Sequence, residues 1–167
     1  MIYKKRTYLI FLFPVLMWCF LIILAPYLMS IHREFAANLI YFLFSPVCHQ
    51  LPERSFFLFG YKLAVCARCT AIYFGFLITS LIYPLFKRID NKETPGKWLL
   101  ILSLIPMGLD GGIQLVTSYE STNQIRAITG GIFGIILPLY IIPVYNTIIY
   151  EVVGWLKTRN QFNQKSS

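Results

Sequence analysis

Three cysteines and a histidine lie close together in the sequence, and these residue types bind transition metals in proteins. Cys66 and Cys69 form a C-x-x-C pair, and Cys48-His49 precedes the pair across a loop that contains proline. Residues three apart share one face of a helix, so the two sulfurs of the pair can reach a common ion or each other. The sequence predicts a zinc site formed by Cys48, His49, Cys66 and Cys69, because three thiolates and one imidazole are a tetrahedral zinc ligand set.

Three interpretations of these cysteines remain open. In the first, only one of the adjacent residues Cys48 and His49 binds the metal, and water completes an open catalytic position. In the second, a structural or redox-active disulfide forms, which is the competing chemistry outside the cytoplasm. In the third, the cysteines are small buried thiols without special chemistry. We interpret Cys19, in the middle of an apolar segment, as packing of this third kind.

Three arginines form the second group of residues that could bind or act on a ligand. Arg54, Arg68 and Arg126 lie beside apolar segments, and guanidinium groups bind phosphates and carboxylates through paired hydrogen bonds. The functional interpretation is a cradle for an anionic or lipid-linked substrate. The structural alternative pairs the arginines with nearby acids, namely Glu53, Asp110 and Glu120.

Asp110 is the only acid within its apolar segment, and Gln114 follows four residues later on the same helical face. An acid at membrane depth indicates a functional site: a metal ligand, a general base or the partner of Arg68. We predict catalytic roles for Asp110, Arg54 and Arg68. The predicted substrate-binding residues are Gln50, Ser55, Gln114, Asn123 and Arg126.

The composition indicates that lipid is the main solvent of this chain. Of its 167 residues, 57% are hydrophobic and 13% are charged, whereas about 25% of a typical soluble domain is charged. The net charge of +8 does not indicate a nucleic-acid partner, because the basic residues gather at the ends of apolar segments, as in membrane proteins. We expect a single integral membrane domain over residues 1–167, with membrane lipid as its partner.

Four apolar segments are long enough to span a bilayer, which takes about 20 residues. The predicted spans are residues 8–29, 63–86, 98–117 and 127–150. The segment 35–47 is too short to span and ends at a proline, so we expect an interfacial or re-entrant helix there. The predicted fold class is an all-α polytopic membrane protein.

Details of the last span can also be predicted. Ser121 and Gln124 have the spacing of a capping box, which places a helix start whose free N–H groups favour an anion. Pro138 and Pro143 should kink the helix, which membrane helices tolerate.

The basic residues also predict the orientation. With the N-terminus in the cytoplasm, the loop at 87–97 and the C-terminus are cytoplasmic, and ten of the 15 basic residues lie inside. A five-span arrangement would put the basic 87–97 loop outside, so we reject it. We expect a multi-pass protein of the cell membrane, with the cysteine and arginine groups at the outer face.

The polar motifs together resemble a known family. They read CHQ-x-P-x-RS from Cys48, C-x-RCT-x-IY-x-G from Cys66, DG-x-x-Q from Asp110 and S-x-N-x-x-R-x-x-TG from Ser121. This combination is similar to the small prokaryotic membrane proteins of domain of unknown function 2085. The chain departs from the family pattern at two positions without losing a ligand or a charge: Ala71 replaces glycine and Ile113 replaces threonine. The resemblance implies that the polar groups act as one unit, and it implies no activity.

Four functions fit these residues. We favour a metal-dependent membrane enzyme whose arginines bind an anionic substrate and whose Asp110 does acid–base work. A small-solute or metal-ion transporter would use Asp110 and Gln114 to line a path. A quinone-linked thiol–disulfide oxidoreductase requires two cysteine pairs at the outer face, and this chain has three suitable cysteines. A non-catalytic membrane subunit would use the polar groups only to fix its loops.

Overall fold

The computed structural model describes the backbone of residues 2–165 and the side chains of residues 5–155 and 159. This part of the chain is mostly helical, as predicted. The helices are α1 (Ile2–Ser30), α2 (Glu34–Phe44), α3 (Ala67–Phe86), α4 (Lys97–Val116), α5 (Asn123–Ile136) and α6 (Pro138–Lys165). Between α2 and α3 lie a 3-10 turn, Pro52–Arg54, and a short antiparallel hairpin of β1 (Phe57–Leu58) and β2 (Tyr61–Lys62).

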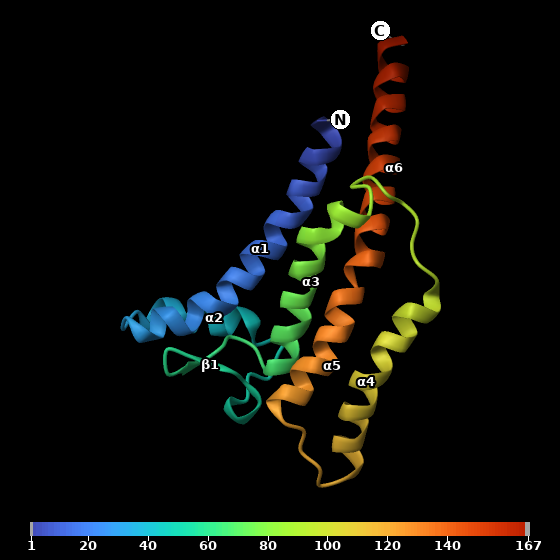
Figure 1. The fold of residues 1–167 in the computed structure, drawn as a ribbon. Coiled ribbons are helices and arrows are strands. Elements are labelled where there is room, and N and C mark those ends of the chain that lie inside the picture. Colours follow the sequence, from blue (N-terminus) through green and yellow to red (C-terminus); the bar gives the residue numbers. More distant parts are fainter. Residues whose placement is uncertain (1, 166–167) are drawn as a thin grey trace.

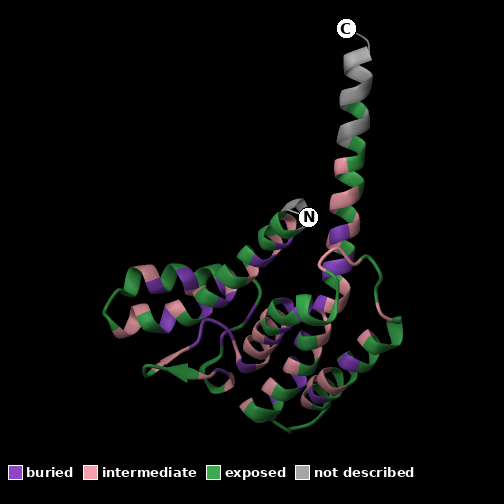
Figure 2. Cartoon of the chain, turned by 45° about the horizontal axis from the view of Figure 1, so that its top comes forward, coloured by how far each residue is buried: buried purple, intermediate pink, exposed green. Residues whose placement is uncertain are grey.

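Four stretches of the described residues are long and apolar enough to cross a membrane, which confirms the predicted multi-pass architecture. They are Lys5–Ser30, Ala67–Phe86, Lys97–Val116 and Asn123–Trp155, the last formed by α5 and α6 together. Exposed residues cover much of the outer surface of these helices (Figure 2), as expected where lipid is the solvent.

The long helices leave the molecule with two distinct ends. Both termini and the loop after α3 lie toward one end, whereas the 45–66 segment and the α4–α5 loop lie at the other (Figure 1). We call the second end the cysteine end, because Cys48 and Cys66 lie there. This arrangement is the one that four spans produce.

The packing of α3 against α5 positions the cysteine end. A Cβ atom on Gly130 would lie 2.5 Å from the carbonyl oxygen of Arg68, and one on Gly134 would overlap the carbonyl oxygen of Ile72. Gly75 approaches the α5 backbone from the other side. We call Gly75, Gly130 and Gly134 the glycine seam. Such small-residue contacts let membrane helices approach closely, so α5 lies directly against the first turns of α3.

Helix α2 lies beside the last turns of α1 at the cysteine end (Figure 1). Its 11 residues are too few to span a bilayer. Ala37, Ile40 and Phe44 are buried, and Phe44 and Ile40 share a core cluster with residues of α1. The same core holds Ala64 and Val65, so α2 anchors the segment that leads into α3.

Two predictions about where helices start are corrected by the structure, and one about a proline is confirmed. The helix of the second span begins at Ala67 and not at residue 63, because the unpredicted hairpin ends at Lys62 and a non-helical link, residues 63–66, follows it. The predicted capping box is wrong: Thr122 caps α5 by accepting a hydrogen bond from the Ile125 N–H at 3.3 Å. The predicted disturbance at Pro138 is confirmed as a break at Leu137 between α5 and α6, because proline cannot donate the helical hydrogen bond.

Candidate metal and anion site

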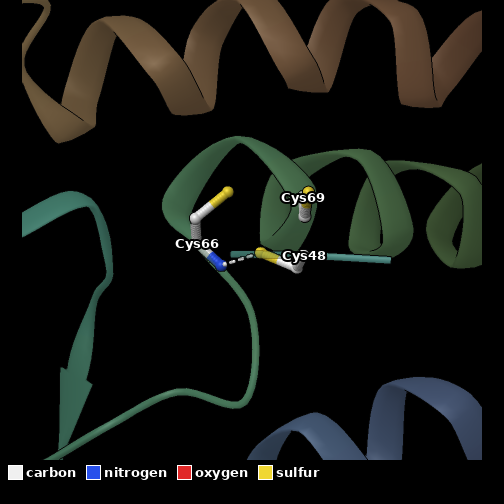
Figure 3. Close-up of side chains that lie close together, drawn as sticks. All are labelled: Cys48, Cys66 and Cys69. Atoms are coloured by element: carbon white, nitrogen blue, oxygen red, sulfur yellow. Dashed lines mark hydrogen bonds between the residues drawn. The ribbon is translucent and has the colours of Figure 1, made fainter. Parts of the chain in front are cut away.

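Three cysteine sulfurs meet at the cysteine end. The Sγ atoms of Cys48, Cys66 and Cys69 all lie within 4.8 Å of one another (Figure 3). Cys66 is the N-cap residue of α3 and Cys69 follows in the first turn, so the C-x-x-C spacing brings these two together as predicted. The loop after α2 brings Cys48, whose sulfur accepts a hydrogen bond from the Cys66 N–H at 3.1 Å.

The sulfur cluster is covered on one side and open on the other. Cys48 is buried in the core of α1 and α2, whereas Cys66 and Cys69 are half-buried. All four cysteines, each within the described part of the chain, are free thiols. Cys19 lies apart in α1, where it donates to the carbonyl oxygen of Tyr73 at 3.4 Å.

The surroundings of Cys48 favour its thiolate. Hydrogen bonds from the Cys66 thiol, and next from the Cys69 thiol, hold the pKa of Cys48 well below its usual range. The backbone N–H groups of Cys66 and Gln50 lower this pKa further, and burial opposes them. The thiolate is the form of cysteine that binds metals, so the geometry and the pKa of Cys48 agree.

A pocket of about 330 Å³ opens beside the sulfurs. Its walls come from the loop after α2, the start of α3, and the facing ends of α4 and α5. Nine of the twelve predicted site residues line it. The lining residues are Val47, Cys48, His49, Gln50, Leu51, Arg54, Cys66, Arg68, Cys69, Gln114 and Arg126.

His49 lines the pocket but is not part of the sulfur cluster. The side chain is exposed, whereas its neighbours Cys48 and Gln50 are buried. In this loop, successive side chains therefore alternate between core and surface. Among the described residues, the group close enough to share one metal ion consists of the three cysteines.

Arg68 is neutralised by groups behind the pocket wall. Its guanidinium forms an ion pair with Asp110, which is only 7% exposed and does not line the pocket. The Ser121 hydroxyl donates to the same Asp110 oxygen at 3.2 Å and accepts from the Gln114 side-chain amide at 3.0 Å. Asp110 is therefore placed as a counter-ion. From the sequence, Ser121 has a predicted capping role and a place in the motif that begins there, but it is not among the predicted site residues; its membership of that motif was the available signal.

Arg126 lines the same pocket and is held by neutral side chains. It is only 5% exposed. Its Nη1 donates to Asn123 Oδ1 at 3.1 Å and its Nη2 to Gln114 Oε1 at 3.5 Å. No carboxylate of the described residues forms an ion pair with it. A buried cation held by neutral amides leaves positive charge available to a ligand in the pocket.

The remaining predicted residues shape the loop around the pocket. Arg54 forms an exposed ion pair with Glu120 at 3.7 Å. The Ser55 hydroxyl donates to a carbonyl of its own loop, and the Ser55 carbonyl accepts from Asn123 at 3.2 Å. Ser55 and Asn123 thus join the loop to α5 and do not line the pocket.

Gln50 has both roles, because it lines the pocket and supports the loop. Its amide donates to the carbonyl oxygen of Tyr41 at 2.6 Å. Its own carbonyl accepts from Lys62 Nζ at 2.7 Å, and its backbone φ is 53°. These bonds from α2 and the hairpin fix the turn that places Cys48 and His49.

The site lies within the part of the chain that is shared with known proteins. A family described as a predicted membrane protein, domain of unknown function 2085, matches residues 48–140. An uncharacterized protein of Methanocaldococcus jannaschii is 44% identical over 152 residues, which cover 88% of this chain and 97% of the relative. An uncharacterized protein of Methanothermobacter thermautotrophicus is 42% identical over 88 residues, which cover 52% of this chain and 77% of the relative. No solved structure matches. Since the family match spans more than half of the chain and begins at Cys48, the chain belongs to the membrane proteins of domain of unknown function 2085.

Proposed function

We propose that the protein is a zinc-dependent membrane enzyme that acts on an anionic substrate at the outer face of the cell membrane. The observation that carries the proposal is the position of three cysteine sulfurs, within 4.8 Å of one another, at the wall of an arginine-lined pocket. Thiolates select soft or borderline metals such as Zn²⁺ over Mg²⁺ or Ca²⁺. Three protein ligands with a fourth open position are typical of catalytic zinc sites.

The residues divide into three roles under this proposal. Cys48, Cys66 and Cys69 hold the metal, which when bound lowers the pKa of a coordinated water and so supplies a nucleophile. Arg68 and Arg126 bind the anionic group of the substrate, since guanidinium forks match phosphate and carboxylate oxygens.

Supporting residues complete the site. Gln114 accepts a hydrogen bond from Arg126 and donates one to Ser121, which in turn donates to the Asp110 carboxylate that pairs with Arg68. Asp110 holds Arg68 in position and takes the counter-ion role in place of the acid–base role expected from the sequence. His49, exposed at the pocket wall, is the group available to carry a proton.

The outer location rests on the distribution of charge. Ten of the 15 basic residues belong to the termini and the loop after α3, and these segments lie toward the same end of the molecule (Figure 1). The positive-inside rule assigns that end to the cytoplasm. The cysteine end then faces outward.

Metal analysis and thiol counting on one purified sample test the metal site. We expect stoichiometric zinc in the unmodified protein and its loss in the double variant Cys66→Ser, Cys69→Ser, which removes two of three ligands. Cys19→Ser is the matched control, because Cys19 is a buried cysteine outside the cluster. Absence of metal, together with the mass decrease of a disulfide that a reductant reverses, would contradict the zinc proposal and favour a thiol–disulfide oxidoreductase.

A further inference from the structure

An apolar surface extends from the cysteine end beside the pocket. On α2, Phe35, Leu39 and Phe42 form one stripe at helical spacing and are 80%, 54% and 76% exposed. Phe57 and Phe59 of the hairpin are also more than half exposed. We call these five residues the apolar shelf. Exposed apolar surface of this kind marks a binding surface.

The shelf continues the lipid-facing surface of α1. Residues 31–33 alone separate α1 from α2, so α2 begins near the level at which α1 ends, and it packs back against α1. Tyr27, near the end of α1, is exposed and packs its ring 5.9 Å from that of Phe59 on the shelf. Because the neighbouring surface of α1 is apolar and exposed over a stretch long enough to cross a membrane, the occupant that fits the shelf is the lipid of the same leaflet.

The shelf also leads directly to the mouth of the pocket. The segment that follows α2 forms one pocket wall, and its side chains Val47 and Leu51 are apolar and exposed. A molecule lying in the leaflet beside α2 therefore reaches the pocket over an apolar rim. Water-soluble anions gain nothing from such a rim, whereas a lipid keeps its chains in an apolar environment as its head group enters.

The volume and charge of the pocket select the part of the lipid that enters. At about 330 Å³, the pocket is near the lower end of the range for small-molecule sites, roughly 300–1,000 Å³, so a head group fits and acyl chains remain outside. Arg126 is buried at the wall without an acidic partner among the described residues. An anionic oxygen of the head group would neutralise it.

We propose that the apolar shelf lies within the outer leaflet and that the pocket binds the phosphate of an anionic membrane lipid, which enters laterally from that leaflet. This inference rests on the proposed function of the pocket as an anion site and names the substrate class. It does not depend on which metal the cysteines hold.

Photo-crosslinking tests the position of the shelf. Benzoylphenylalanine is placed at Phe42 on the shelf, at Phe20 on the exposed surface of α1, and at Thr94 in the exposed loop at the opposite end. In vesicles of phosphatidylcholine with phosphatidic acid, we expect lipid adducts at Phe42 comparable with those at Phe20 and far above those at Thr94. Adducts of Phe42 with a second copy of the chain, or a lipid yield no higher than at Thr94, would overturn the proposal.

Ligand titration tests the source of the anion. The full-length protein in detergent is titrated with short-chain phosphatidic acid, short-chain phosphatidylcholine and inorganic phosphate. We expect phosphatidic acid to bind about tenfold or more tightly than the other two, a difference of about 1.4 kcal/mol. If inorganic phosphate binds as tightly as phosphatidic acid, the ligand is a free anion and not a lipid. If phosphatidylcholine binds as tightly as phosphatidic acid, the pocket does not select an anionic head group.

Variants connect the binding to the pocket. Arg126→Gln should weaken phosphatidic acid binding by about 10- to 100-fold, as expected for loss of a charged hydrogen bond. Arg88→Gln, an exposed arginine at the other end, is the matched control and should leave binding unchanged. Arg54→Gln, on the exposed side of the pocket, should weaken binding less and serves if Arg126→Gln does not fold. An unchanged affinity in both Arg126→Gln and Arg54→Gln would overturn the proposal.

The double variant Cys66→Ser, Cys69→Ser separates this inference from the metal proposal. If the protein contains no zinc but still binds phosphatidic acid, the metal proposal is contradicted and the lipid site is supported. Stoichiometric zinc without phosphatidic acid binding overturns the lipid site alone.

Discussion

The charges of two arginines in the pocket, the half-buried Arg68 and the buried Arg126, are balanced in different ways. Arg68 is paired with Asp110, and Ser121 donates to the same carboxylate. Arg126 contacts two amide side chains and no carboxylate among the described residues. A charge at membrane depth is costly unless it is paired. Both arginines line the pocket, and we infer that Arg126, which no described carboxylate neutralises, contributes more to the binding of an anion than Arg68 does.

The Arg68–Asp110 pair leads to a prediction about stability. Asp110→Asn leaves Arg68 without its counter-ion, so we expect the free energy of unfolding to fall by about 1–3 kcal/mol, measured by denaturation in detergent. Glu120→Gln removes the acid of the exposed pair with Arg54 and should cost less than about 1 kcal/mol. An equal effect of the two substitutions would show that Asp110 does not act as a structural counter-ion.

At the scale of elements, the α3–α5 contact determines where the arginines lie. The glycine seam allows the α5 backbone to contact the Arg68 and Ile72 carbonyls. Arg126 and Asn123 lie in the first turns of α5, so the seam also sets the distance from Arg126 to the sulfurs on α3. Larger side chains in the seam would separate the pocket walls.

Alanine substitutions test the seam. Gly134→Ala places a methyl group against the Ile72 backbone, and overpacking of this kind costs about 1–3 kcal/mol. Gly112→Ala is the matched control, because a Cβ on that glycine of α4 meets nothing within 4 Å. We expect lower stability for Gly134→Ala and unchanged or slightly higher stability for Gly112→Ala in the same denaturation assay. If the two variants were equally stable, α3 and α5 could move apart without a loss of stability, and the close contact at the glycine seam would not be required.

Some elements could be predicted from the sequence and others could not. Long apolar segments specify spans through their composition alone, and α2 was recognised because it is too short to cross. The hairpin was missed because its turn is formed by Phe59 and Gly60, both at positive φ. Asparagine or aspartate before glycine is the usual sequence signal for such a turn, and here a phenylalanine precedes the glycine.

In the candidate site, too, some contacts could be predicted from the sequence and others could not. The C-x-x-C spacing predicted the contact of Cys66 with Cys69, because it depends on helix geometry alone. The pairing of Arg68 with Asp110 was one of several alternatives, since 42 residues separate the partners. Whether His49 or Cys48 faces the other sulfurs depends on the course of the loop, which is fixed by the bond that Gln50 donates to the Tyr41 carbonyl and the bond that it accepts from Lys62.

At the scale of the whole molecule, sidedness can be measured directly. A cysteine introduced at Glu53, in the exposed loop of the cysteine end, should react with a membrane-impermeant maleimide added to intact cells. A cysteine at Lys92, in the exposed loop at the opposite end, should react only after permeabilisation. The protein without an added cysteine gives the background from its own thiols. The reverse pattern would place the pocket on the cytoplasmic side.

The wide separation of the ion-pair partners along the chain has a consequence for biosynthesis. Arg68 emerges from the ribosome 42 residues ahead of Asp110, which at about 5–20 residues per second is a delay of roughly 2–8 seconds. All three cysteines of the cluster also precede α4. Translation therefore completes the three thiols before it supplies Asp110 and the pocket residues Gln114 and Arg126. A metal ion captured at that stage would be in place before the second half of the protein closes around it.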